Sequence, residues 1–180
     1  NKYVQTPEMD DLAKKGTYFK TAIVTTPICA ASRASILTGT LSHINGFKDN
    51  SSIFDTNLVT FPKLLRNAGY ETAVIGKWHL GLGLGNVNWN EHISPGPNEV
   101  GFDYSFILPG SLDMYPYAFL KNNVWQGEVS EQKGWSAFNR VGPAAKDFED
   151  HKVSETFFVE AENFIGKQYS DQPFCLFISL

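Results

Sequence analysis

The sequence predicts an α/β fold in which a mostly parallel sheet is flanked by helices. Short apolar segments typical of buried strands alternate with segments whose apolar residues recur at helical spacing. Glycine, proline and asparagine separate these segments, as expected for turns. Such alternation is typical of parallel sheets covered by helices, where functional sites form in loops at the carboxyl ends of strands.

Helices are expected at several places along the chain. Residues 6–16 start with a capping threonine and a proline, carry acids in the first turn and end at a glycine. Further helices are expected at 29–37, where small residues follow a cysteine, and at 60–69, which ends at a glycine. Residues 154–168 show the clearest helical spacing of apolar side chains.

Extended segments fill the positions between the helices. Residues 17–24 are β-branched and aromatic, and 70–75 form an apolar run that leads into a polar cluster. Residues 104–108 and 117–120 are strand candidates, and the two asparagines that follow the second favour a hairpin turn. Residues 174–180 indicate a buried strand.

Two segments are expected to be loops. Residues 81–101 are rich in glycine, asparagine and proline, and 127–150 show little periodicity.

Composition bounds the class of protein. The chain has 180 residues, 42% of them hydrophobic, which suits one domain or part of a larger one with its own core. The net charge of -4 and the absence of a basic cluster argue against nucleic acid as a partner. No apolar run approaches the roughly 20 residues that span a bilayer. Both ends look cut, because the chain starts at Asn1 and ends in a strand.

Residues 29–33 read Cys-Ala-Ala-Ser-Arg and form the first candidate site. A lone cysteine near an arginine is ordinarily a structural helix start. At a helix N-terminus, however, Cys29 would meet unpaired N–H groups and the positive end of the helix dipole. Arg33, four residues on, would share its face, so both features would stabilise an anion or oxyanion at position 29.

Residues 76–81 read Gly-Lys-Trp-His-Leu-Gly and form the second candidate site. The plain interpretation is a strand end with an exposed lysine, a packed tryptophan and an incidental histidine. Strand alternation would instead point Lys77 and His79 into one pocket while Trp78 packs behind. An ammonium beside an imidazole suits an oxyanion with a labile proton.

Together these two runs resemble the two signatures of type I, formylglycine-dependent sulfatases. The first is followed by the expected Thr38-Gly39 turn, the order and separation are family-like, and residues 95–104 resemble bacterial arylsulfatase-like members. The resemblance covers nearly the whole chain. It implies an alkaline phosphatase-like fold, with 1–180 as part of an N-terminal catalytic domain that lacks the first strand and the C-terminal part.

The resemblance implies a hydrolase of sulfuric esters, acting on aryl or carbohydrate sulfates. Cys29 would be oxidised to formylglycine, whose hydrate attacks sulfur, forms a covalent sulfo-enzyme and then eliminates sulfate. Arg33 would hold the hydrate, Lys77 would bind sulfate oxygens, and His79 would bond the hydrate and move a proton. Ser111 matches a serine that touches the sulfate region.

A Ca²⁺ ion is also implied, because it would bind the hydrate and a sulfate oxygen. Cys29, as formylglycine, is the one expected metal ligand within the chain. The paired aspartates and the other ligands of the family would lie before Asn1 and after Leu180, so we expect the 180 residues alone to bind Ca²⁺ weakly and to hydrolyse nothing. Four acids are expected to have capping or surface roles instead: Asp10, Asp11, Asp49 and Asp55.

Other reactive side chains receive ordinary roles. His43 lies near the first motif, where a supporting or structural role is favoured over a catalytic one. His92 and His151 are expected to be solvated. Cys175, in an apolar strand, is expected to be an inert buried thiol, and its context argues against a disulfide with Cys29.

Ala31 stands where many sulfatases have proline. Alanine there favours a bacterial source and a radical, anaerobic-type maturase as partner, and the family implies a periplasmic or extracellular location. The substrate would be a sulfated small molecule or carbohydrate, selected largely by loops 81–101 and 111–128.

Two alternatives stay open. The first is a formylglycine-dependent phosphonate or phosphodiester hydrolase, against which the run at 76–81 argues. The second is a non-catalytic carbohydrate-binding relative, which sugar-stacking aromatic residues would suit: Trp78, Trp89, Tyr115 and Trp125. The retained Cys29, Arg33, Lys77 and His79 argue against it.

Overall fold

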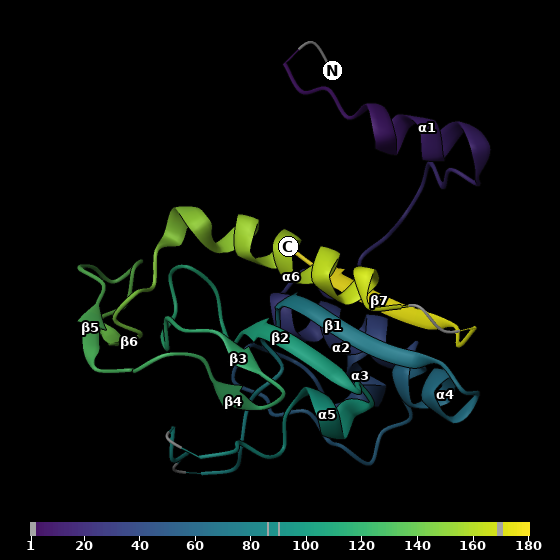
Figure 1. Ribbon diagram of the computed structural model, residues 1–180. Helices are drawn as coiled ribbons and strands as arrows, with labels where there is room; N and C mark the ends of the chain where they lie inside the picture. Colours follow the sequence, from purple (N-terminus) through teal and green to yellow (C-terminus); the bar gives the residue numbers. More distant parts are fainter. Residues whose placement is uncertain (1–2, 86, 90, 169–170) are drawn as a thin grey trace.

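The computed structural model describes residues 3–85, 87–89, 91–168 and 171–180. Within these residues the central sheet has five strands in the order β4-β3-β2-β1-β7 (Figure 1). Its parallel part comprises β1 (Glu71–Lys77), β2 (Tyr104–Leu108) and β7 (Phe174–Ser179). Two short antiparallel strands extend it, β3 (Leu120–Lys121) and β4 (Val124–Trp125). The predicted α/β fold with a mostly parallel sheet is confirmed.

Helices lie on both faces of this sheet (Figure 1). α6 (Val153–Gly166) follows the 3₁₀ turn η1 (Asp150–Lys152) and covers one face. The other face carries α2 (Cys29–Thr38), α4 (Phe61–Asn67) and α5 (Pro97–Val100), with α3 (Ser42–Asn45) packed beside α2. The predicted helices at 29–37, 60–69 and 154–168 are confirmed with small shifts of their ends.

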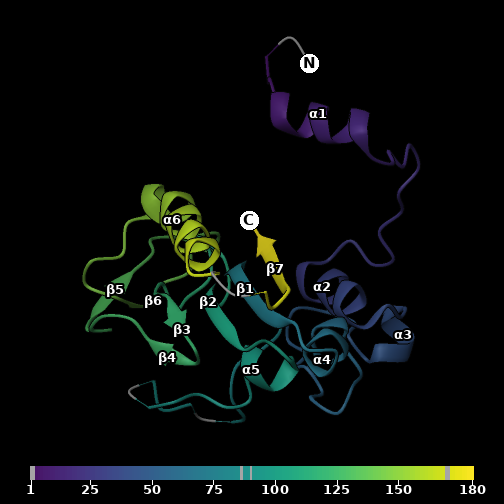
Figure 2. The same cartoon turned by 45° about the vertical axis from the view of Figure 1, so that its right-hand side comes forward.

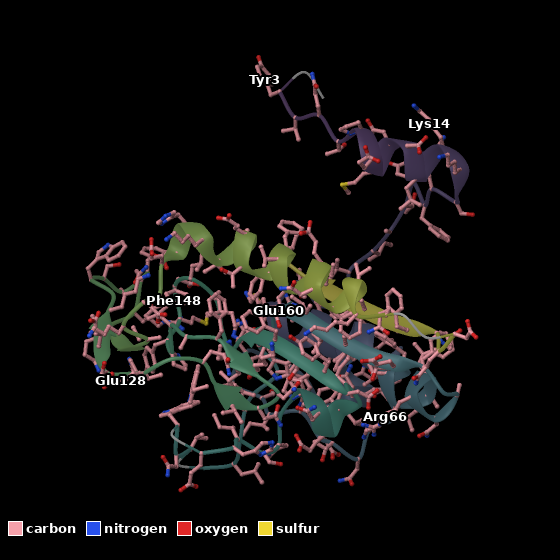
Figure 3. All side chains as sticks on the ribbon, viewed as in Figure 1. Tyr3, Lys14, Arg66, Glu128, Phe148 and Glu160 are labelled. Atoms are coloured by element: carbon pink, nitrogen blue, oxygen red, sulfur yellow. The ribbon has the colours of Figure 1, made fainter. Side chains whose placement is uncertain are left out.

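Strand alternation divides the core between the two faces. Ala73 and Ile75 of β1 face α6 and pack with Phe157, whereas Val74 faces the other way and packs in the cluster that holds Trp78. Full burial of each large apolar side chain contributes about 1.5–3 kcal/mol. Figure 3 shows Glu160 reaching from α6 toward the sheet, where it pairs with Lys121. β1 is thus fixed on both faces.

The local sequence explains where α4 and β1 begin and end. Thr60 caps α4 by accepting a hydrogen bond from the Lys63 N–H, and its own hydroxyl donates to the Val100 carbonyl at 2.6 Å. The fully buried Thr72 donates to the Gly101 carbonyl at 2.8 Å. β1 then runs through the core and delivers Lys77 to the carboxyl edge of the sheet, opposite Leu108 of β2.

Several expectations about single segments are wrong. Residues 17–24 form no strand. Residues 127–150 are not all loop, since β5 (Glu131–Lys133) and β6 (Gly142–Ala144) pair in a small second sheet. Tyr117 makes only an isolated bridge to Ala144, and the strand before the confirmed asparagine hairpin starts at Leu120. The reason is that long-range pairing decides these short segments more than their composition.

The N-terminal arm stands clear of the body (Figure 2). α1 (Pro7–Lys15) confirms the predicted first helix but has no buried residue, and Thr6 makes no side-chain cap to its backbone. β7 lies at the edge of the sheet rather than fully buried, with Phe174 and Ile178 exposed. Among the described residues, no helix has the length and apolar character needed to cross a membrane.

Candidate active site

Cys29 is the first residue of α2 and is half-buried. Its neighbours Ala30, Ala31 and Ala34 are fully buried, so their small side chains bring the helix close to the rest of the core. The Ala30 N–H donates to the Asn50 side-chain oxygen at 3.1 Å. The helix N-terminus therefore lies at Cys29 itself, as the motif predicts.

Lys77, the last residue of β1, approaches this cysteine. Its Nζ lies 3.3 Å from Cys29 Sγ, although 48 residues separate the two along the chain. The structure thus brings an ammonium, a helix N-terminus and a potential nucleophile together. The Lys77 ammonium and the positive end of the α2 dipole both lie at the sulfur. This arrangement suits a ligand or intermediate with negative charge.

Arg33 links α2 to β1 and β7 next to this contact. Its Nη1 donates to the Lys77 carbonyl oxygen at 2.9 Å and to the Ser179 hydroxyl at the end of β7. Burial lowers the pKa of Arg33, and the nearby Cys29 opposes this change. The guanidinium stays charged because an arginine pKa is ordinarily above 12. Arg33 therefore fixes α2, β1 and β7 relative to one another and keeps a positive charge beside Cys29.

His79 follows β1 in a left-handed backbone conformation with φ 57°. The strand ends at Lys77, so simple alternation does not place His79, contrary to our expectation. Its backbone N–H donates to the Pro109 carbonyl at 2.8 Å, and the residue is only 8% exposed. Among the described residues its buried Nδ1 has no hydrogen-bond partner. Trp78 packs behind, edge-on to Phe102.

The electrostatic surroundings keep this imidazole neutral. Burial, followed by the charges of Lys77 and Arg33, lowers the pKa of His79 to about 4. At neutral pH the ring therefore offers one N–H donor and one acceptor nitrogen. A bound anion would offset the positive charges and favour protonation.

Ser111 lies in the loop after β2 and is half-buried. Its hydroxyl donates to the Asp113 carboxylate, and this hydrogen bond lowers the pKa of Asp113. Within the described part of the chain, Ser111 makes no hydrogen bond to Cys29 or Lys77. Ser111 follows the carboxyl end of β2, so it lies at the same edge of the sheet as Lys77, but its hydroxyl is bound within its own loop.

A cavity of about 350 Å³ opens beside His79. Its walls include Asn50, Trp89, Tyr115 and Arg140. Of the aromatic residues expected to stack on sugar, Trp89 and Tyr115 line it, whereas Trp78 and Trp125 are buried in the core.

Sequence reasoning missed three residues of this region. Asn50 and Arg140 lie in loops that carry no motif, so nothing in the chain marks them. Ser179 could have been found, because it ends a predicted parallel strand, where functional side chains gather.

The remaining candidates have local roles. His43 is exposed on α3 beside Thr25 and Lys48, away from the cavity at His79. His92 and His151 are exposed, as expected. The four acids that we expected at caps or the surface bind nearby groups, Asp10 with Thr6, Asp11 with Lys15, Asp49 with Ser51 and Asp55 with Asn57.

Both cysteines are free thiols. Cys175 is half-buried rather than fully buried, and its burial raises the pKa of its thiol.

The described residues do not by themselves fit a calcium ion. No group of three or more His, Cys, Asp or Glu side chains gathers anywhere in this part of the chain. Ca²⁺ takes about six to eight oxygen ligands, whereas the side chains in contact with Cys29 and its neighbour Lys77 are cationic or neutral.

The fold and site define an α/β domain of hydrolase type in which Lys77 and Arg33 surround a cysteine at the N-terminus of a helix. The family model described as Sulfatase matches residues 1–180. An N-acetylglucosamine-6-O-sulfatase of Bacteroides thetaiotaomicron is 34% identical over 173 residues, which is 96% of this chain and 25% of that protein. An N-acetylgalactosamine-6-O-sulfatase of the same organism is 41% identical over 125 residues, 66% of this chain and 24% of that protein. The chain belongs to the sulfatase family.

Solved structures agree with this assignment. A structure from work on the metabolism of multiple glycosaminoglycans by Bacteroides thetaiotaomicron matches with a TM-score of 0.81 at 27% identity, covering 97% of this chain and 45% of that one. Another, in complex with its substrate D-glucosamine-2-N,6-O-disulfate, matches with a TM-score of 0.65 at 32% identity, covering 97% and 28%. The fold is alkaline phosphatase-like, and this chain spans about a quarter of the curated relatives' length.

Proposed function

We propose that the complete protein containing this chain hydrolyses sulfate esters, with formylglycine formed from Cys29 as its nucleophile. The observation that supports this most strongly is the 3.3 Å approach of Lys77 Nζ to Cys29 Sγ at the start of α2. In formylglycine the Cβ of Cys29 becomes the aldehyde carbon, so Sγ stands in for an oxygen of the aldehyde or its hydrate. The hydrate supplies one hydroxyl to attack sulfur and a second to release sulfate.

The surrounding side chains then have distinct tasks. Lys77 donates to an oxygen at position 29 or to a sulfate oxygen, and the α2 N-terminus adds its dipole. Arg33 balances the negative charge and, through the Lys77 carbonyl and Ser179, holds the helix against the sheet. Neutral His79 accepts a proton on one nitrogen or donates from the other. Ser111 approaches the substrate once its hydroxyl leaves Asp113.

The partners of the complete protein follow from its relatives. Those relatives are named for 6-O-sulfated amino sugars, and we propose a carbohydrate sulfate of this kind as substrate. A maturase must oxidise Cys29, and Ala31 favours the radical type. We place the protein in the periplasm or outside the cell. Calcium would need oxygen ligands from parts of the complete protein beyond residues 1–180.

Mass spectrometry of the Cys29 peptide tests the nucleophile. The complete protein is produced with each class of maturase, and we expect an aldehyde in place of the thiol with one of them. Cys29→Ala should lower aryl sulfate turnover about 10⁴-fold or more, as loss of other enzyme nucleophiles does. Cys175→Ala is the matched control and should leave turnover unchanged.

Other outcomes are equally informative. A plain thiol at position 29 with both maturases would refute the mechanism. Faster turnover of an aryl phosphodiester than of an aryl sulfate would assign the protein to the phosphodiester hydrolases instead.

A further inference from the structure

We propose that Arg140 forms a second anion-binding subsite, so that the preferred substrate carries another sulfate or a carboxylate besides the ester that is cleaved. This inference rests on the proposed sulfate ester hydrolysis and adds the charge pattern of the substrate. Arg140 lies in the loop between β5 and β6, in the wall of the cavity that His79 also lines.

The guanidinium of Arg140 is available for a ligand. Within the part of the chain that the structure describes, it makes neither a hydrogen bond nor an ion pair with another side chain. Asp113 is close enough for the two charges to interact, but its carboxylate is bonded by the Ser111 hydroxyl. Arg140 is an exposed residue of the cavity wall, and a guanidinium without a side-chain partner is suited to bidentate binding of sulfate or carboxylate.

The backbone of Arg140 is anchored, so the subsite has a defined position. The Arg140 N–H donates to the Asp113 carbonyl at 3.2 Å, and the Arg140 carbonyl accepts from the Tyr117 hydroxyl at 2.7 Å. Tyr117 is fully buried. A fixed backbone at the cavity wall lowers the entropic cost of holding an anion there.

Arg140 is separate from the cations that serve Cys29. Lys77 contacts the Cys29 sulfur, and Arg33 is bound to the Lys77 carbonyl and to Ser179. Neither of these two cations lines the cavity, whereas Arg140 does. An anion bound by Arg140 would therefore be distinct from one held by Lys77 at Cys29.

The cavity beside His79 and Arg140 has the size and lining for a sugar. Its volume of about 350 Å³ is within the range of small-molecule sites. Trp89 and Tyr115 offer aromatic faces, and the Asn50 amide offers a polar group. Burial and the charges of Lys77 and Arg33 lower the pKa of His79, Asp113 opposes them, and Arg140 adds a smaller lowering effect, so the charge of Arg140 reaches the His79 side of the cavity.

Matched sugar sulfates test the proposal. The complete protein carrying Cys29→Ala, which binds without turnover, is titrated by calorimetry with N-acetylglucosamine 6-sulfate and N-sulfoglucosamine 6-sulfate. A second pair joins a 6-sulfated hexosamine either to a hexuronic acid or to a neutral hexose. We expect the dianionic member of at least one pair to bind about tenfold tighter, the effect of one charge-assisted hydrogen-bonded pair.

Variants identify the residue responsible. Arg140→Met should abolish the preference for the dianion, and Arg140→Lys should keep part of it. Arg66→Met is the matched control, because Arg66 lies on α4 at the amino-terminal end of β1 (Figure 3), and it should preserve the full preference.

Three results would overturn the inference: no binding by any dianionic sugar, equal binding within both pairs, or an undiminished preference in Arg140→Met. Failure of the proposed function is seen separately, as absence of aryl sulfate turnover by the matured enzyme.

Discussion

Gly76 lies against the backbone of Ser179 in β7, and Gly76→Ala should push these two strands apart at the candidate site. Gly76 has φ 120°, a conformation that an alanine adopts only with strain, and it is paired in register with Ser179 of β7. A Cβ at this position would overlap the Ser179 carbonyl oxygen and lie 2.6 Å from its carbonyl carbon. These are backbone atoms, so β7 itself must move to admit the methyl group.

The expected loss of stability has two parts. The positive φ costs an alanine about 1–2 kcal/mol, and overpacking against β7 adds about 1–3 kcal/mol. The sum is about 2–5 kcal/mol of the free energy of unfolding. Gly69→Ala separates the parts, because Gly69 has φ 90° but no atom within 4 Å of the added Cβ. Its loss should be the strain alone.

Urea unfolding of both variants measures the difference. The midpoint of Gly76→Ala should fall well below that of Gly69→Ala with an unchanged m-value. Displacement of Ser179 should also loosen Arg33, so aryl sulfate turnover of the complete protein should fall in Gly76→Ala only. Equal destabilisation by the two substitutions would refute the reasoning, because it would mean that β7 does not press on Gly76.

Two further predictions concern Arg33 and His79. Arg33→Lys should lower kcat about 10–100-fold in steady-state assays. The reason is that a single ammonium on a shorter side chain cannot contact the Lys77 carbonyl, Ser179 and position 29 together. An unchanged kcat would contradict this prediction. The folded His79 titrates at about 4 against an ordinary value of 6.5, so the unfolded chain binds more protons between these values. The contribution of His79 to the free energy of unfolding is therefore fully present above pH 6.5 and is lost as pH falls toward 4. We expect urea unfolding at a series of pH values to show a loss of at most about 3 kcal/mol. His79→Gln should remove this slope, and a slope that persists in that variant contradicts the assignment.

Local sequence patterns predicted those helices and strands whose own residues show a regular apolar spacing or clear start and stop residues. Such patterns mark the helix at 29–38, the strand at 104–108 and the long helix α6. Residues 17–24 have strand composition but pair with no strand in the described part of the chain, and β5 reads Glu-Gln-Lys, which no pattern of alternating apolar residues marks. Pairing between distant segments decides both cases.

The same distinction applies to the site. Motif spacing pointed to Cys29 and Lys77, and the structure brings their side chains within 3.3 Å, whereas their catalytic roles stay predictions. The bond from Arg33 to Ser179 and the left-handed turn at His79 depend on how β1, β2 and β7 meet, which no local pattern encodes.

The contact between Arg33 and Ser179 can form only late in synthesis of the chain. The two residues are 146 positions apart, and at a synthesis rate of about 5–20 residues per second this gap takes roughly 7–30 s to translate. Until β7 arrives, Arg33 can bond the Lys77 carbonyl of β1 but lacks its second partner, the Ser179 hydroxyl. If Cys29 is oxidised as we propose, the maturase would have several seconds in which α2 is not yet bonded to β7.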